Sequence, residues 1–306
     1  MDLLSDILIG VIAAATPLIF AAIGELVVEK AGVLNLGVEG MMIMGAVAAF
    51  AASVATGSAT FGVVSAMIAG AAMAALFGVL TLTLMSNQVA TGLALTMFGL
   101  GLSALIGQSY SGMSVPTFPR LDIPVLSSLP VVGRLLFARD ALFYLSIVLV
   151  AGTACVLSAT RAGLVLRAIG ENHDAAHAIG YPVIAYRYLA LMFGGACAGL
   201  GGAYLSLVQT PIWVEKMTAG RGWIALALVV FAAWRPGRVL AGAYLFGGIS
   251  VLQLHAQGFG LAIDPQILAM FPYLATILVL VIISADKMRL KLNAPASLGK
   301  PFFAPA

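Results

Sequence analysis

Polar residues interrupt one of the most apolar parts of this sequence at EKAGVLNLGVEGMMIMGA, residues 29–46. Asn35 and Glu39 are four residues apart, so on a helix they would lie on one face. An amide and a carboxylate can hydrogen-bond to the hydroxyl groups of a solute. We therefore predict that Asn35 and Glu39 line a solute pathway, at a helix that the neighbouring glycines interrupt.

The same stretch has a simpler interpretation. Residues 25–39 could form a turn at a membrane surface, with Glu39 close to a helix N-terminus, where the helix dipole favours an acid. Glu39 could also only neutralise Lys30. The sequence leaves both interpretations open.

A second polar segment is RAGLVLRAIGENHDAAHAIGYPVIAYR, residues 161–187. Asn172 can cap a short helix, and Gly180 followed by Pro182 would end it. The predicted helix runs through Asp174, Ala175, Ala176 and His177. A helix this short does not serve to cross a bilayer, so it is either a docking element or a linker.

Two histidines of this segment have a spacing that could bind a metal ion. His173 and His177 lie four residues apart and would share a helix face. No third ligand is nearby in the sequence. We therefore predict no metal site.

The third segment is EKMTAGRGWIALALVVFAAWRPGR, residues 215–238, whose apolar run is about 13 residues and too short to cross comfortably. A helix that begins deep in the membrane after irregular backbone would line a cavity. On that interpretation Arg221 and Trp223 belong to the pathway. The alternative is an ordinary span that Trp223 and Trp234 anchor at the two membrane interfaces.

Composition places all three segments in a membrane protein. Of 306 residues, 62% are hydrophobic and 9% are charged, whereas a soluble domain has roughly 25% charged residues. Apolar runs long enough for helices of about 20 residues predict an all-α, polytopic protein with about 8–10 transmembrane helices, one of them broken. The candidate spans are 6–24, 40–56, 61–85, 89–108, 141–160, 188–209, 222–234, 239–256 and 266–285.

Basic residues in the short connections predict the orientation. The connection at 161–187, the turn with Arg235 and Arg238, and the residues after the last span all fall on one side, which we assign to the cytoplasm. The N-terminus is then outside. The loop 109–140, which this orientation places outside, also carries arginines. Because it is longer, its charges count less toward the orientation. We predict a multi-pass protein of the bacterial inner or plasma membrane that binds no nucleic acid.

Catalytic signatures are absent from the sequence. It contains no GxxxxGK[ST] phosphate-binding loop, no GxSxG and no HExxH. We therefore predict that the chain is not an enzyme, has no catalytic residues and binds no cofactor itself. It looks like a conduit whose energy comes from elsewhere.

Four motifs, in order, resemble the membrane permeases of ABC importers. They are EKAGVLNLGVEGMMIMGA, LRAIGENHDAAHAIGYPV, ACAGLGGAYLSL and MTAGRGWIALALVVFAAWRPG, within residues 20–250. The resemblance is to the branch for nucleosides and simple sugars, related to branched-chain amino acid and ribose permeases. The sequence departs from the family pattern at two places. His173 stands where the family usually has proline, and FAAWRP replaces a more glycine-containing version. Both departures leave the family resemblance intact and weaken only the prediction of the substrate.

The resemblance implies a mechanism and a set of partners. One permease domain, 1–306, would pair with a second, related permease in the lipid bilayer and receive its solute from an extracytoplasmic binding protein or lipoprotein. A separate ATPase subunit would hold ATP and Mg and dock on the cytoplasmic loop 161–187. The residues implied in this coupling are Glu171, Asn172, Asp174, Ala175, Ala176 and Gly180.

Three alternatives stay open. A branched-chain amino acid ABC permease differs only in substrate. An ion-coupled secondary transporter would need several intramembrane charges or two matching broken helices, and Glu39 is the one good candidate here. A non-transporting assembly subunit would suit the cytoplasmic loop but not the two pathway-like segments.

Overall fold

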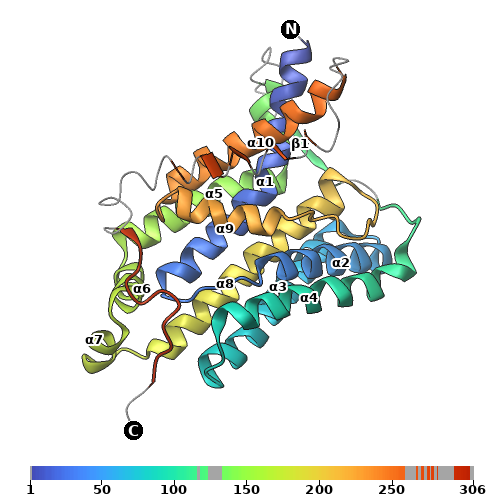
Figure 1. The fold of residues 1–306 in the computed structure, drawn as a ribbon. Coiled ribbons are helices and arrows are strands. Elements are labelled where there is room, and N and C mark those ends of the chain that lie inside the picture. Colours follow the sequence, from blue (N-terminus) through green and yellow to red (C-terminus); the bar gives the residue numbers. More distant parts are fainter. Residues whose placement is uncertain are drawn as a thin grey trace.

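The computed structural model describes residues 2–115, 118–122, 133–258 and 293–303, with a few positions between 267 and 281. Within these residues, seven helices are long and apolar enough to cross a membrane, and α9 is a shorter apolar helix. The ninth expected span, 266–285, lies mostly outside the described residues. The all-α, multi-pass architecture is confirmed (Figure 1).

The long helices are α1 (Asp2–Lys30), α2 (Val38–Thr56), α3 (Ala59–Gly78), α4 (Gln88–Gly107), α5 (Ala141–Ala159), α8 (Val183–Tyr204) and α10 (Pro236–Gly258). The shorter ones are α6 (Arg161–Glu171), α7 (His173–Ala178) and α9 (Arg221–Phe231). Short π-helices follow α3 (Val79–Thr83) and α8 (Leu205–Gln209), and a third spans Gly133–Phe137. A 3-10 helix, Gln108–Tyr110, follows α4. Strands β1 (Arg120–Asp122) and β2 (Ala138–Asp140) pair antiparallel.

The long helices form where the chain is apolar on every side, as expected for segments in lipid or in the centre of a bundle. Side chains cap several of the helices at their N-termini. Asn87 accepts from the Ala90 N–H, Asp140 from Phe143 and Thr160 from Gly163. Each cap satisfies one backbone donor that a helix N-terminus leaves free.

Helix α8 lies in the centre and packs against α1, α2 and α3. Glycines allow these backbones to approach closely. A Cβ at Gly45 would meet the backbone of Gly199, and a Cβ at Gly70 would meet that of Gly195. Gly45 and Gly70 therefore allow α2 and α3 to pack closely against α8.

The bundle has two different ends (Figure 1). The α7 end holds α6, α7, the last turn of α1 and residues 293–303, because Ser297 donates its N–H to the Gly170 carbonyl. The opposite end holds the start of α1, the described residues 108–115, 118–122 and 133–140, and the first residues after Gln209. There the Val115 N–H donates to the Pro211 carbonyl. A functional site must be placed relative to these two ends.

Candidate functional sites

Helix α9 begins inside the bundle, where the carboxylate of Glu39 holds its N-terminus. One Glu39 oxygen accepts from the Thr218 hydroxyl at 2.5 Å and from the Gly220 N–H at 2.9 Å. The other oxygen accepts from the Gly222 N–H at 2.6 Å. We call Glu39, Thr218, Gly220 and Gly222 the α9 anchor.

A carboxylate such as that of Glu39 is favourable at the N-terminus of α9 for two reasons. The first N–H groups of a helix have no partner inside the helix, and the positive end of its dipole favours a carboxylate. Gly222 is required because a Cβ there would meet the backbone and carboxylate of Glu39. Gly40, next to Glu39, packs against Leu95 and Thr96 in the middle of α4, so the anchor lies deep in the bundle.

Asn35 belongs to a different network. It lies before α2, and its N–H and side-chain amide each donate to the Glu25 carboxylate at 3.3 Å. Its side-chain oxygen accepts from the Gly37 N–H at 2.9 Å. The expectation that Asn35 and Glu39 share a helix face is therefore wrong, because Asn35 forms a local turn within the non-helical connection 31–37.

Trp234 is not an interfacial anchor. It is 6% exposed, and its indole N–H donates to the Glu29 carboxylate at 2.5 Å. A buried indole needs such a partner for its polar atom. The connection between α9 and α10 is thereby tied to α1. Sequence reasoning assigned no role to Glu25, Glu29 or Thr218. Glu29 and Thr218 bind partners far away in the sequence, and Glu25 binds Asn35 only because the chain turns between α1 and α2.

Arg221 and Trp223 occupy the first turn of α9. Both are half-buried, and Arg221 donates to the Met217 carbonyl at 3.0 Å. The fold thus places Arg221 and Trp223 directly beside the α9 anchor, with Asn35 at the neighbouring start of α2. Their contribution to a solute pathway stays a prediction.

Helix α7 forms as the sequence predicts. The Asn172 side chain accepts from the Ala175 N–H at 3.0 Å. At the other end Gly180 adopts φ = 92° and donates to the His177 carbonyl at 2.8 Å. Of the predicted coupling residues, the exposed ones are Glu171, Asn172, Asp174, Ala175 and Gly180, whereas Ala176 is buried.

The C-terminal residues hold α7 in place, which the sequence did not reveal. Phe302 is 4% exposed and packs between the rings of His173 and His177, each with a centroid distance of 5.3 Å. The spacing of the two histidines therefore serves to hold an aromatic ring. Within the described residues, no group of three or more metal-ligating side chains occurs.

Arg187, at the start of α8, completes this arrangement. It is fully buried and donates to the Ala31 carbonyl at 3.1 Å and the Lys300 carbonyl at 3.3 Å. It also lies 3.1 Å from the Nδ1 atom of His173. We call Arg187, His173, Ala31, Lys300 and Phe302 the α7 latch.

The latch fixes the protonation state of His173. A guanidinium can only donate, so Nδ1 of His173 must accept and the proton lies on Nε2, which is 3.7 Å from Asp174. Burial of the imidazole, followed by the charge of Arg187, lowers the pKa of His173 below its usual value. The neutral ring is therefore the form that the latch uses.

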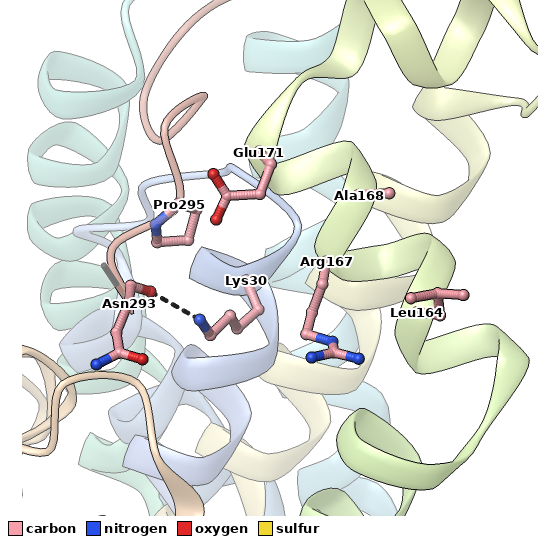
Figure 2. Close-up of a pocket in the computed structure, with 7 residues that line it drawn as sticks. All are labelled: Lys30, Leu164, Arg167, Ala168, Glu171, Asn293 and Pro295. Carbon is pink, nitrogen blue, oxygen red and sulfur yellow. Dashed lines mark hydrogen bonds between the residues drawn. The ribbon is translucent and has the colours of Figure 1, made fainter. Parts of the chain in front are cut away.

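Figure 2 shows a polar cavity of about 360 Å³ beside the latch, between α1, α6 and residues 293–295. The Lys30 ammonium donates to the Asn293 carbonyl at 2.7 Å. The side chains of Arg167 and Glu171 extend from α6 into the same space. Charged groups therefore surround the point where the C-terminal segment meets α1 and α6.

The protein-family model described as branched-chain amino acid transport system, permease component, matches residues 7–283. The chain belongs to this permease family. It is a transport component of the plasma membrane and crosses the membrane several times.

Individual relatives of this permease carry more specific names. It is 41% identical over 314 residues to the putative glucose ABC transporter permease protein TsgC13 of Haloferax volcanii, covering 95% of each chain. It is 31% identical to the nucleoside ABC transporter permease protein NupC of Lactococcus lactis, covering 92% of each chain. It is 30% identical to the guanosine ABC transporter permease protein NupQ of Bacillus subtilis, also covering 92% of each chain.

Proposed function

We propose that this permease carries simple sugars or nucleosides across the plasma membrane as one subunit of an ABC importer. The observation that carries the proposal is the 30–41% identity, over more than nine tenths of the chain, to permeases named for glucose, nucleosides and guanosine. The family description names branched-chain amino acid transport, so branched-chain amino acids are the alternative substrate. The broad match to these named permeases favours the sugar and nucleoside class.

Helix α7 is the proposed docking element for a separate ATPase subunit. Asp174 is exposed on α7, Glu171 is exposed at the adjoining end of α6, and Ile179, which follows α7, is 72% exposed. A short helix seated in a partner's groove can transmit rigid-body motion. The loop 161–187 would then be cytoplasmic, and ATP and Mg would bind to the partner.

The solute pathway is proposed to pass along the start of α9, with Arg221 and Trp223 at its wall. Glu39 supports this wall by holding the N-terminus of α9, and Asn35 supports the start of α2 through Glu25. Because the hydrogen-bonding groups of Glu39 and Asn35 are used within the chain, we assign both to positioning the wall. A second, related permease would supply the facing wall, and an extracytoplasmic solute-binding protein would deliver the solute.

Uptake by the reconstituted complex tests the substrate. Proteoliposomes would hold the permeases, the ATPase and the binding protein, with ATP on the side of the membrane where the ATPase is bound. Labelled glucose, guanosine and leucine would each be added on the opposite side. We expect uptake of glucose or guanosine and none of leucine. Uptake of leucine alone would establish the amino acid alternative.

A second experiment tests docking. Deletion of 171–177 should reduce co-purification of the ATPase or leave its hydrolysis uncoupled from uptake. Ser158→Ala, at an exposed residue outside the loop 161–187, serves as the control. Normal uptake by the deletion variant with its ATPase attached would remove α7 from the coupling role.

A further inference from the structure

We propose that a cavity at the end of the bundle opposite α7 is a binding site for a neutral, polyhydroxylated solute. The proposal rests on the proposed transport function and adds a site that lies apart from the α9 anchor. The cavity has a volume of about 560 Å³, within the roughly 300–1,000 Å³ typical of small-molecule sites. It lies between the first half of α1, strand β2 and the end of α8.

The wall of the cavity combines fixed acceptors and donors. Asp140 and Tyr204 are 6% and 2% exposed, and the Tyr204 hydroxyl donates to one Asp140 oxygen at 3.5 Å. The Tyr204 hydroxyl also has a side-chain hydrogen bond with Thr16. Because the contact with Asp140 is long, the carboxylate has capacity for a further donor. The other Asp140 oxygen caps α5 through the Phe143 N–H at 2.9 Å, which keeps the carboxylate in place.

The rest of the wall supplies an amide and an aromatic ring. Gln209 is exposed at the cavity mouth and Phe118 is half-buried in its wall. The Phe118 N–H donates to the Leu207 carbonyl at 3.2 Å, which holds the backbone of Phe118 beside the end of α8. An aromatic face next to planar polar groups suits a ring that carries hydroxyls on its edge and C–H groups on its face.

The backbone of α8 changes where it meets the cavity. Leu205–Gln209 is a π-helical turn, closed by the Thr210 N–H on the Leu205 carbonyl at 2.9 Å. Such turns occur frequently at functional sites, where they redirect side chains. Here the π-turn carries Val208 and Gln209, two residues that line the cavity.

Charge determines the class of ligand. Arg139 and Asp140 lie side by side in β2 and contribute opposite charges, so the cavity has no net charge to attract an ion. Arg139 donates its Nε–H to the Leu135 carbonyl at 3.0 Å. The remaining hydroxyl, amide and carboxylate groups match a sugar or the ribose of a nucleoside.

Protection of an introduced cysteine tests the site. The Gln209→Cys variant would be made in a chain with Cys155→Ala and Cys197→Ala, assembled with its partners in proteoliposomes. An impermeant thiol reagent would be added on the side of the cavity with glucose, guanosine or leucine present. The control is Ser111→Cys, an exposed residue at the same end that does not line the cavity.

We expect glucose or guanosine to slow labelling at 209 about threefold once its concentration reaches about twice its Kd. Labelling at 111 should not change, and leucine should protect neither position. Adding Tyr204→Phe, which removes only the hydroxyl, should weaken the protection at 209.

Three results would overturn the site: equal labelling at 209 with and without sugar or nucleoside, no labelling at 209 at all, or protection by leucine. Uptake in the same proteoliposomes separates this proposal from the previous one. Intact uptake of glucose or guanosine without protection removes the site and leaves the function. Protection without uptake of either solute leaves the site and removes the proposed function.

Discussion

The α9 anchor and the α7 latch both organise short helices, but they do so in opposite ways. In the anchor, one carboxylate collects three donors from a single turn of chain. In the latch, one guanidinium contacts acceptors on three separate segments: the connection that follows α1, helix α7 and the C-terminal residues. The anchor lies deep in the bundle, whereas the latch ends beside Phe303, which is 69% exposed.

This difference suggests different mechanical roles. Removing the Glu39 carboxylate would leave several donors unpaired together, so the anchor should open only when α9 itself unfolds. The latch is held by contacts of separate segments, each of which can be lost alone. We therefore expect the start of α9 to behave as a fixed wall and α7 to be the adjustable element.

The largest effect should come from Glu39→Leu. It removes the acceptor of three donors, and each buried unpaired donor costs about 1–3 kcal/mol. We expect a loss of folding free energy on the order of 4 kcal/mol, measured as a lower thermal unfolding midpoint in detergent. Glu215→Leu, at an exposed acid in the same loop, should have little effect. A Glu39→Leu protein as stable as wild type would mean that the anchor does not hold α9.

Arg187→Met should come next. The substitution keeps the aliphatic length and leaves the Ala31, Lys300 and His173 acceptors without their donor. We expect a loss of about 3 kcal/mol and faster proteolysis of residues 293–303. Arg161→Met, at an exposed arginine, is the matched control. Unchanged protection of the C-terminal residues would contradict the role of Arg187 as the centre of the latch.

Phe302→Ala tests the latch without changing a charge. Burial of a phenylalanine side chain stabilises by roughly 2 kcal/mol, so the substitution should release the C-terminal residues while the helices stay folded. Hydrogen exchange of 296–303 and of α7 would report the release. Phe303→Ala changes the same residue type at an exposed position and should exchange like wild type. Similar exchange for both variants would show that Phe302 does not secure α7.

The smallest effect should be a dependence on pH. The folded state lowers the pKa of His173 below its usual 6.5, so the unfolded state binds more protons near that pH. The stabilisation is therefore present above about pH 6.5 and lost as the pH falls below it. Hydrogen exchange of 296–303 should accelerate on going from neutral to mildly acidic solution.

Substitution of the two histidines separates the source of this pH effect. His173→Phe should remove the acid sensitivity, and His177→Gln should keep it. Besides His173, the charged groups that bear on its pKa are Arg187, Asp174 and Lys300. Acid sensitivity that survives His173→Phe would show that His173 is not its source.

The sequence predicted those features whose causes are local. Asn172 as a cap and Gly180 as a stop lie within a few residues of the groups that they bind, so α7 could be read directly. The apolar runs likewise predicted the long helices, because each helix satisfies its own backbone hydrogen bonds in lipid. The short apolar run after Gly222 predicted a short helix, which is α9, and left open whether it begins deep in the membrane.

Features with distant partners could not be predicted. Glu39 binds groups 179 to 183 residues away, and Phe302 packs on histidines more than a hundred residues earlier. No spacing rule links such positions, since their contact depends on how α1, α2 and α8 pack. Asn35 was misplaced on the helix of Glu39 because the sequence does not show that the chain turns before Val38.

By itself, the sequence determined that this chain is a helical membrane protein, where its helices run, and that α7 forms between two of them. Hydrophobicity and capping act over a turn or two of chain, so composition and order suffice for these. Only the tertiary structure decided that Glu39 supports α9, that Trp234 turns inward to Glu29, and that the C-terminal residues hold α7. Each of these depends on burying a polar group or a ring beside a partner that packing alone brings within reach.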